Sequence, residues 1–69
     1  MSGKEIRNLR HALGMTQLEF ALFLGTDPSL VSKWENEVVE PKATTKLLLR
    51  IVKTLLEEGY PIQKIYCQN

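Results

Sequence analysis

The chain has very few of the residues that build metal, redox and membrane sites. Cysteine and histidine occur once each, as Cys67 and His11, which excludes an internal disulfide and leaves too few ligands for a zinc site. No apolar run approaches the roughly 18 residues of a membrane span, and the charged start Ser2–Glu5 is unlike a secretion signal. We therefore expect a cytoplasmic protein without a metal, a cofactor or a membrane contact.

The groupings of residues that catalysis needs are missing too. No nucleophile has a base at a useful spacing, no two carboxylates are placed for acid and base roles, and no run of glycines is suited to holding a phosphate. A chain of 69 residues also has little room for a substrate pocket. The sequence predicts that the protein is not an enzyme.

Linker-forming residues are scarce, which favours one folded unit. The three prolines and four glycines are scattered, whereas a flexible or semi-rigid linker would concentrate them. Apolar residues at 43% and charged residues at 25% exclude a disordered chain. The net charge of +1 neither indicates nor excludes nucleic acid as a partner. We predict one domain over residues 1–59 and a tail, 60–69, that is either packed or disordered.

Two helix starts carry the same signature. Ser2 with Glu5, and Thr16 with Glu19, have the spacing of a capping box, in which each side chain satisfies an orphan backbone N–H of the other residue. Apolar residues at helical spacing follow each start, and a glycine closes each helix. The pattern predicts one helix that ends at Gly14 and a second, of about eight residues, that ends at Gly25.

The third predicted helix follows after a very short turn. Asp27 can cap it, and Pro28 fits its first position, where the missing N–H costs nothing. Only Gly25 and Thr26 separate it from the helix before. That is too short for an antiparallel hairpin and favours a crossing of about 90–120°. We therefore predict a helix-turn-helix over residues 17–36.

A fourth helix is predicted from about Thr44 to Glu58, with Gly59 and Pro61 beyond its end. It has more apolar positions than one buried face requires. We assign one row to the core and expect the other to meet either the tail or another subunit. The core row is Leu47, Leu48, Ile51 and Leu55, the second row is Leu49, Val52 and Leu56, and the tail residues suited to pack against the domain are Ile62, Ile65 and Tyr66.

The segment from Thr16 to Asn36 resembles the Cro/repressor (XRE-type) helix-turn-helix family, and the resemblance extends over roughly residues 6–56. Four features carry it: Thr-Gln at the start of the second predicted helix, a small residue where the second and third helices cross, a glycine in the turn between them, and Trp-Glu-Asn at the end of the third helix. It implies an all-α, compact bundle of four to five helices of the lambda-repressor-like DNA-binding type. The residues concerned are Thr16, Gln17, Ala21, Gly25, Val31, Trp34, Glu35 and Asn36, with Arg10–Gly14 before them and Pro41 after.

Two features depart from the common pattern of that family. Glu37 stands where a glycine is usual, so the bend there must use a non-glycine residue or a different path. The usual fourth and fifth helices are replaced by the single long helix from Thr44, and in this respect the chain resembles the DNA-binding halves of MqsA-type and HigA-type antitoxins.

The resemblance assigns roles to individual residues. In such proteins the third helix enters the major groove, and its outward residues meet base edges. Other polar residues contact phosphates, and a partly buried ion pair joins the first helix to the end of the third. Asp27 has an alternative role, as a cap that touches no base. The base contacts are Asp27, Pro28, Ser29, Ser32 and Lys33, the phosphate contacts are Gln17, Asn36 and Lys42, and the ion pair is Arg10 with Glu35.

Two functions follow from these assignments. The first is a transcriptional regulator that binds a palindromic operator in double-stranded DNA as a homodimer. The second is an antitoxin-type module that binds a toxin protein and regulates its own gene through the same helix-turn-helix. The second rests on apolar residues beyond those a monomer needs. The surface available to a second subunit or a toxin comprises Leu18, Leu22, Leu49, Val52 and Leu56.

Overall fold

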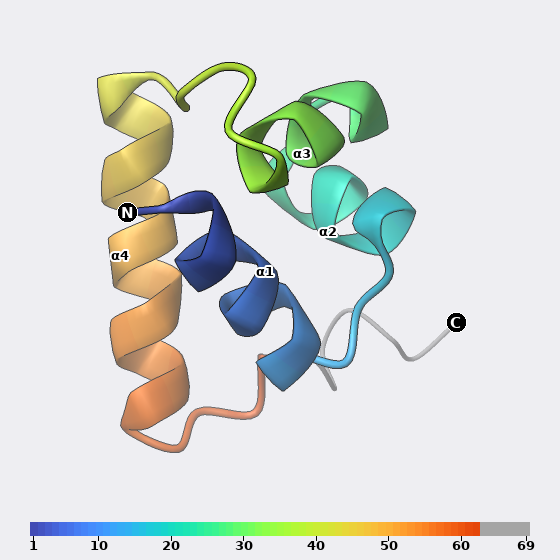
Figure 1. Ribbon diagram of the computed structural model, residues 1–69. Helices are drawn as coiled ribbons and strands as arrows, with labels where there is room; N and C mark the ends of the chain where they lie inside the picture. The colour runs from blue at the N-terminus through green and yellow to red at the C-terminus, as the bar shows by residue number, and fades with distance from the viewer. Residues whose placement is uncertain (63–69) are drawn as a thin grey trace.

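The computed structural model describes residues 1–62, and within that range the chain forms four helices and no strand. They are α1 (Gly3–Ala12), α2 (Gln17–Leu24), α3 (Pro28–Glu35) and α4 (Ala43–Glu57). In Figure 1, α4 stands on one side, α1 lies in the middle, and α2 and α3 form the opposite side. The predicted all-α fold is confirmed. None of these helices is long and apolar enough to cross a membrane.

Both predicted capping boxes are present. At α1, Ser2 Oγ accepts the N–H of Glu5 at 3.2 Å, and the Glu5 carboxylate accepts the N–H of Ser2 at 2.8 Å. Thr16 and Glu19 repeat this exchange at α2, at 3.1 and 2.8 Å. The backbone N–H of Ser2 stabilises the ionised form of Glu5 and so lowers the pKa of that carboxyl. The two helix starts are therefore fixed by local sequence.

The turn between α2 and α3 is short because Gly25 bends the chain sharply. Its φ is 74°, in the left-handed region that glycine adopts without a steric cost. The following N–H, of Thr26, reaches back to the carbonyl of Ala21 at 2.8 Å. Asp27 then caps α3. Ala21 is completely buried, which allows α2 and α3 to approach closely.

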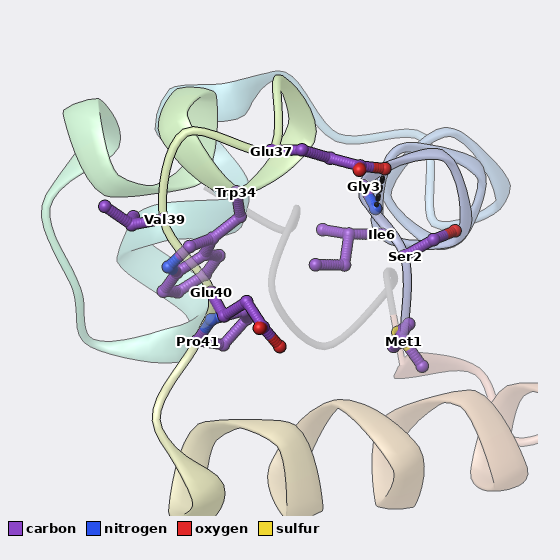
Figure 2. A pocket seen from close by; sticks show the side chains of 9 residues that line it. All are labelled: Met1, Ser2, Gly3, Ile6, Trp34, Glu37, Val39, Glu40 and Pro41. Carbon is purple, nitrogen blue, oxygen red and sulfur yellow. Dashed lines mark hydrogen bonds between the residues drawn. The ribbon is translucent and has the colours of Figure 1, made fainter.

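The bend after α3 uses Glu37 instead of a glycine. Its φ is 58°, so a residue with a side chain occupies the left-handed region. The Glu37 carboxylate accepts the backbone N–H of Gly3 at 3.2 Å, which ties this bend to the start of α1 (Figure 2). Gly3 lies so close to the end of α3 that an added Cβ would stand 2.5 Å from the carbonyl oxygen of Glu35. A pocket of about 240 Å³ opens beside this junction.

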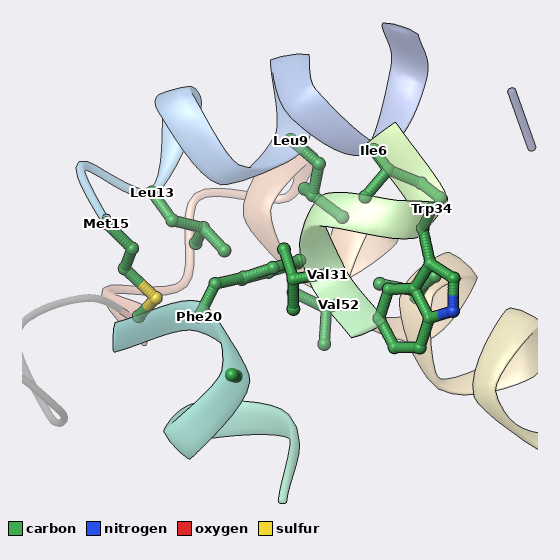
Figure 3. Close-up of a cluster of buried hydrophobic side chains, with 10 residues drawn as sticks. Ile6, Leu9, Leu13, Met15, Phe20, Val31, Trp34 and Val52 are labelled. Atoms are coloured by element: carbon green, nitrogen blue, oxygen red, sulfur yellow. The ribbon is translucent and has the colours of Figure 1, made fainter. Parts of the chain in front are cut away.

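The core is one cluster to which all four helices contribute (Figure 3). Phe20 of α2 and Val31 of α3 are completely buried within it, and Trp34 is 5% exposed. Val31 and Trp34 are therefore core residues. The full cluster is Ile6, Leu9, Leu13, Met15, Phe20, Ala21, Val31, Trp34, Leu49 and Val52.

The prediction of which side of α4 faces the core was wrong. The row assigned to a partner is the row that packs inward, with Leu49 and Val52 buried and Leu56 half-buried against the core. The row assigned to the core is exposed, to between 37% and 56%; it comprises Leu47, Leu48, Ile51 and Leu55. Both rows have helical spacing, and packing against the rest of the bundle, which spacing does not encode, decides which one is buried.

The first residues of the predicted tail differ among themselves. Ile62 is half-buried and packs against the core, whereas Tyr60 is exposed. At Ile62 the structure thus shows packing, one of the two alternatives left open for the tail. The other tail residues considered above, Ile65, Tyr66 and Cys67, lie outside the described residues.

Candidate nucleic-acid interface

The outward side of α3 carries four of the five residues predicted to contact bases. Pro28, Ser29 and Lys33 are exposed, and Ser32 is half-buried. On the opposite side of the same helix, Val31, Trp34 and Glu35 are buried. An eight-residue helix with one buried and one polar, accessible side is suited to lie in a groove.

The fifth residue, Asp27, caps the helix. Its Oδ1 accepts both the backbone N–H and the hydroxyl of Ser29, each at 2.8 Å. These hydrogen bonds, the backbone one first, lower the pKa of the Asp27 carboxyl. The alternative role of Asp27 as a cap is therefore confirmed, while a base contact by the same side chain stays a prediction.

Polar side chains at the end of α3 bind one another. The Asn36 amide donates to the carbonyl oxygen of Ser32 at 2.9 Å and lies 3.4 Å from the Ser32 hydroxyl. The side chain of Lys33, between them, makes no hydrogen bond or ion pair with any residue in the range 1–62, and its charge helps to lower the pKa of Asp27. Its ammonium group is therefore available to an external acceptor such as a base edge or a phosphate.

A buried carboxylate joins α1, α2 and α3. The side chain of Glu35 is 0% exposed. Arg10 donates to it through Nε at 2.6 Å and Nη2 at 3.1 Å, and also binds the carbonyl oxygen of Met15 at 3.0 Å. The predicted pair of Arg10 and Glu35 is confirmed. Burial raises the pKa of Glu35, but hydrogen bonds from Arg10 and Gln17 and the Arg10 charge together lower it below its ordinary value.

A family comparison agrees with this arrangement of helices. The family model described as helix-turn-helix matches residues 6–55, which include most of the described chain. The chain belongs to the helix-turn-helix family. This supports the resemblance to Cro/repressor (XRE-type) proteins, and it indicates a DNA-binding regulator in which α2 and α3 form the helix-turn-helix. Searches among curated proteins and among solved structures each found no match.

The phosphate contact predicted at the start of the helix-turn-helix, Gln17, is already engaged inside the protein. Its Nε2 donates to Glu35 Oε1 at 3.2 Å, and its side chain is half-buried. Arg7 reaches the same oxygen through Nε at 3.4 Å. Sequence reasoning missed both contacts. The one available signal was that Arg7 lies three positions before Arg10, on the same side of α1.

The remaining predicted phosphate contact, Lys42, lies at the start of α4. It occupies the cap position but makes no side-chain hydrogen bond to the helix, and it is exposed. Near it, Lys46 binds Glu40 at 2.9 Å, and this contact lowers the pKa of the Glu40 carboxyl. The ammonium group of Lys46 thus offsets the negative charge of Glu40, which is one of the two acidic residues in the segment between the helix-turn-helix and α4.

Leu18 and Leu22, predicted as part of a partner surface, are exposed on α2. Their exposed fractions are 56% and 60%. Because they are four residues apart on a helix, they lie on the same side of it. The helix-turn-helix therefore exposes this pair of leucines on α2 in addition to the polar residues of α3.

Proposed function

We propose that the protein is a cytoplasmic transcriptional regulator that binds a palindromic operator as a two-fold dimer. The observation that carries the proposal is the division of α3 into a buried side and an outward polar side within a helix-turn-helix. Each copy would place α3 in the major groove, and two copies would reach half-sites about 34 Å apart, one turn of DNA. We expect the outward side of α3 to contact bases, and residues at the ends of the helices to contact phosphates.

Base recognition is proposed for the outward residues of α3. The free ammonium of Lys33 is suited to donate to guanine O6 and N7, and the hydroxyls of Ser29 and Ser32 bond to either kind of base. Phosphate contacts are proposed for Gln17, at the positive end of the α2 dipole, and for Asn36. Lys42 is a further phosphate contact at the start of α4.

A dimer is part of the proposal because one short helix reads few bases. A monomer with so few contacts would compete poorly against the nonspecific sites of a genome. The exposed row of α4, which comprises Leu47, Leu48, Ile51 and Leu55, is the surface proposed for a second copy, since an exposed contiguous apolar row favours association. We expect Ile51→Glu to shift sedimentation toward the monomer and to weaken operator binding more than binding to random DNA.

The proposal is tested by selecting bound sequences from a randomised duplex pool at near-physiological salt. Enrichment of a palindrome with half-sites one turn apart is the expected result. Lys33→Ala should then weaken the selected operator more than random DNA, whereas Gln17→Ala should weaken both to the same extent. Equal losses from Lys33→Ala on both duplexes would remove its base-reading role, and a pool without enrichment would contradict operator binding.

A second candidate function is an antitoxin whose DNA binding regulates its own gene. The observation that favours it is the exposure of Leu18 and Leu22 on one side of α2, since neighbouring exposed apolar side chains favour association with another protein. We expect a toxin encoded by a neighbouring gene to co-purify with the tagged protein, and Leu18→Glu with Leu22→Glu to abolish that association. Retention of the association by this double variant would contradict the assignment of the surface.

A further inference from the structure

The carboxylate of Glu35 is surrounded by donors from three side chains, and most of them converge on one of its two oxygens. A carboxylate offers about four lone-pair sites. Four N–H groups point at that of Glu35, three at Oε1, from Arg10 at 3.1 Å, Gln17 at 3.2 Å and Arg7 at 3.4 Å, and one at Oε2, from Arg10 at 2.6 Å. The contact of Arg7 is the longest of the four.

This arrangement leaves most of the hydrogen-bonding capacity of Arg7 unused. A guanidinium carries five N–H donors, and only Nε of Arg7 is engaged with another residue of the described chain. Its side chain is 44% exposed, against 11% for Arg10. Two guanidinium groups also face one carboxylate, so the cluster as a whole carries an excess positive charge. Unpaired donors on an exposed, positively charged group are suited to an anion.

The position of Arg7 next to Gln17 indicates which anion. Arg7 and Gln17 bind the same oxygen atom of Glu35, so both donor groups lie within hydrogen-bond distance of one point. The Gln17 amide has a second N–H beyond the one given to Glu35. Gln17 is also the first residue of α2, where free backbone N–H groups and the helix dipole favour a phosphate.

We propose that Arg7 is a DNA-phosphate ligand that shares one phosphate with Gln17. Glu35 positions both groups from behind and touches no DNA itself. This inference rests on the proposed function, because the phosphate belongs to the duplex that α3 reads. It extends the interface from the helix-turn-helix onto α1, and it assigns to Arg7 a role distinct from that of Arg10, which stabilises the fold.

The experiment measures duplex affinity by fluorescence anisotropy over a series of salt concentrations, for the selected operator and for a random duplex. We expect Arg7→Ala to weaken both by about tenfold, the loss of one charged hydrogen-bonding contact. The plot of log K against log salt should become less steep, with the magnitude of its negative slope smaller by about 1. Arg7→Lys should restore the slope and part of the affinity. Lys4→Ala is the matched control, because Lys4 is an exposed cation one turn earlier on α1 and makes no contact with Glu35; its slope should remain that of the wild type.

Sharing of one phosphate is tested with operators that carry a single neutral methylphosphonate at each backbone position in turn. Among the positions that weaken the wild-type complex, one and the same position should have a smaller effect on both Arg7→Ala and Gln17→Ala. An unchanged salt slope in Arg7→Ala, with thermal unfolding like that of the wild type, would overturn the role of Arg7. If the effect of the methylphosphonate were reduced at different positions in the two variants, the sharing of one phosphate by Arg7 and Gln17 would be overturned. If the wild-type protein binds no duplex, the proposed function fails and this inference fails with it.

Discussion

Removing Arg10 should strongly destabilise the domain, because it leaves the buried carboxylate of Glu35 without its main partner. Arg10→Met keeps a long side chain but removes two hydrogen bonds to Glu35 and one to the carbonyl oxygen of Met15. Removing one partner of a buried ion pair costs about 3–5 kcal/mol. Arg7 and Gln17 still reach the carboxylate, so we expect the lower end, about 3 kcal/mol.

A loss of that size is large for a chain of 69 residues. Its total stability is expected to be roughly 3–10 kcal/mol, from typical values per residue. Each kcal/mol lowers the midpoint of thermal unfolding by about 4–8 °C in a domain of this size. Arg10→Met should therefore lower the midpoint by at least about 12 °C.

Urea unfolding provides the assay, followed by the fluorescence of the single tryptophan. Trp34 is 5% exposed and precedes Glu35 in α3, so its emission reports on the affected part of the core. The double variant Arg10→Met with Glu35→Leu is the informative comparison, because it removes the buried charge together with its partner. We expect the double variant to be more stable than Arg10→Met alone. A loss below about 1 kcal/mol in the single variant, or a double variant less stable than the single one, would refute the reasoning.

Three further predictions concern stability. Because the pKa of Glu35 is lowered in the folded state, the contribution of its carboxylate to stability is fully present above the ordinary pKa of about 4.3 and is lost as the pH falls through the pKa of the folded state. The midpoint of urea unfolding should therefore fall more steeply in acid for the wild type than for Glu35→Gln. Gly3→Ala should lower the free energy of unfolding in urea by about 1–3 kcal/mol, since the added Cβ would meet two backbone carbonyl oxygens of α3. An increase in stability, which is the usual effect of Gly→Ala within a helix, would contradict that close approach. Ala21→Leu should cost a similar amount, about 1–3 kcal/mol, because Ala21 is completely buried, and circular dichroism should show an unchanged helix content at a lower melting temperature.

The parts of the fold that the sequence predicted are those governed by neighbouring residues. A capping box needs two side chains three positions apart, and a left-handed turn needs a glycine at one position. Ser2 with Glu5, Thr16 with Glu19, and Gly25 each carried their own signal, and the structure has all three features. The starts of the first two helices and the short turn of the helix-turn-helix followed from such signals, whereas the fourth helix was predicted from its apolar spacing and from the glycine and proline beyond its end.

The parts that the sequence did not predict depend on packing between elements. Helical spacing shows that α4 has two apolar rows, but only contact with the rest of the bundle decides that Leu49 and Val52 turn inward and Ile51 outward. The convergence of Arg7 and Gln17 on Glu35 requires three helices to be placed together. The family resemblance supplied the pair of Arg10 and Glu35, and the two additional donors carried no pattern of their own.

The hydrogen bond between Gln17 and Glu35 has a consequence for the thermodynamics of binding. A surface glutamine normally samples many rotamers, and fixing a long side chain on association costs about 0.5–1.5 kcal/mol of conformational entropy. Gln17 is already held at 3.2 Å from Glu35 in the free protein, so that ordering is completed during folding. A phosphate therefore meets a donor already in position, and calorimetry of Glu35→Gln should show a less favourable entropy of DNA binding than that of the wild type.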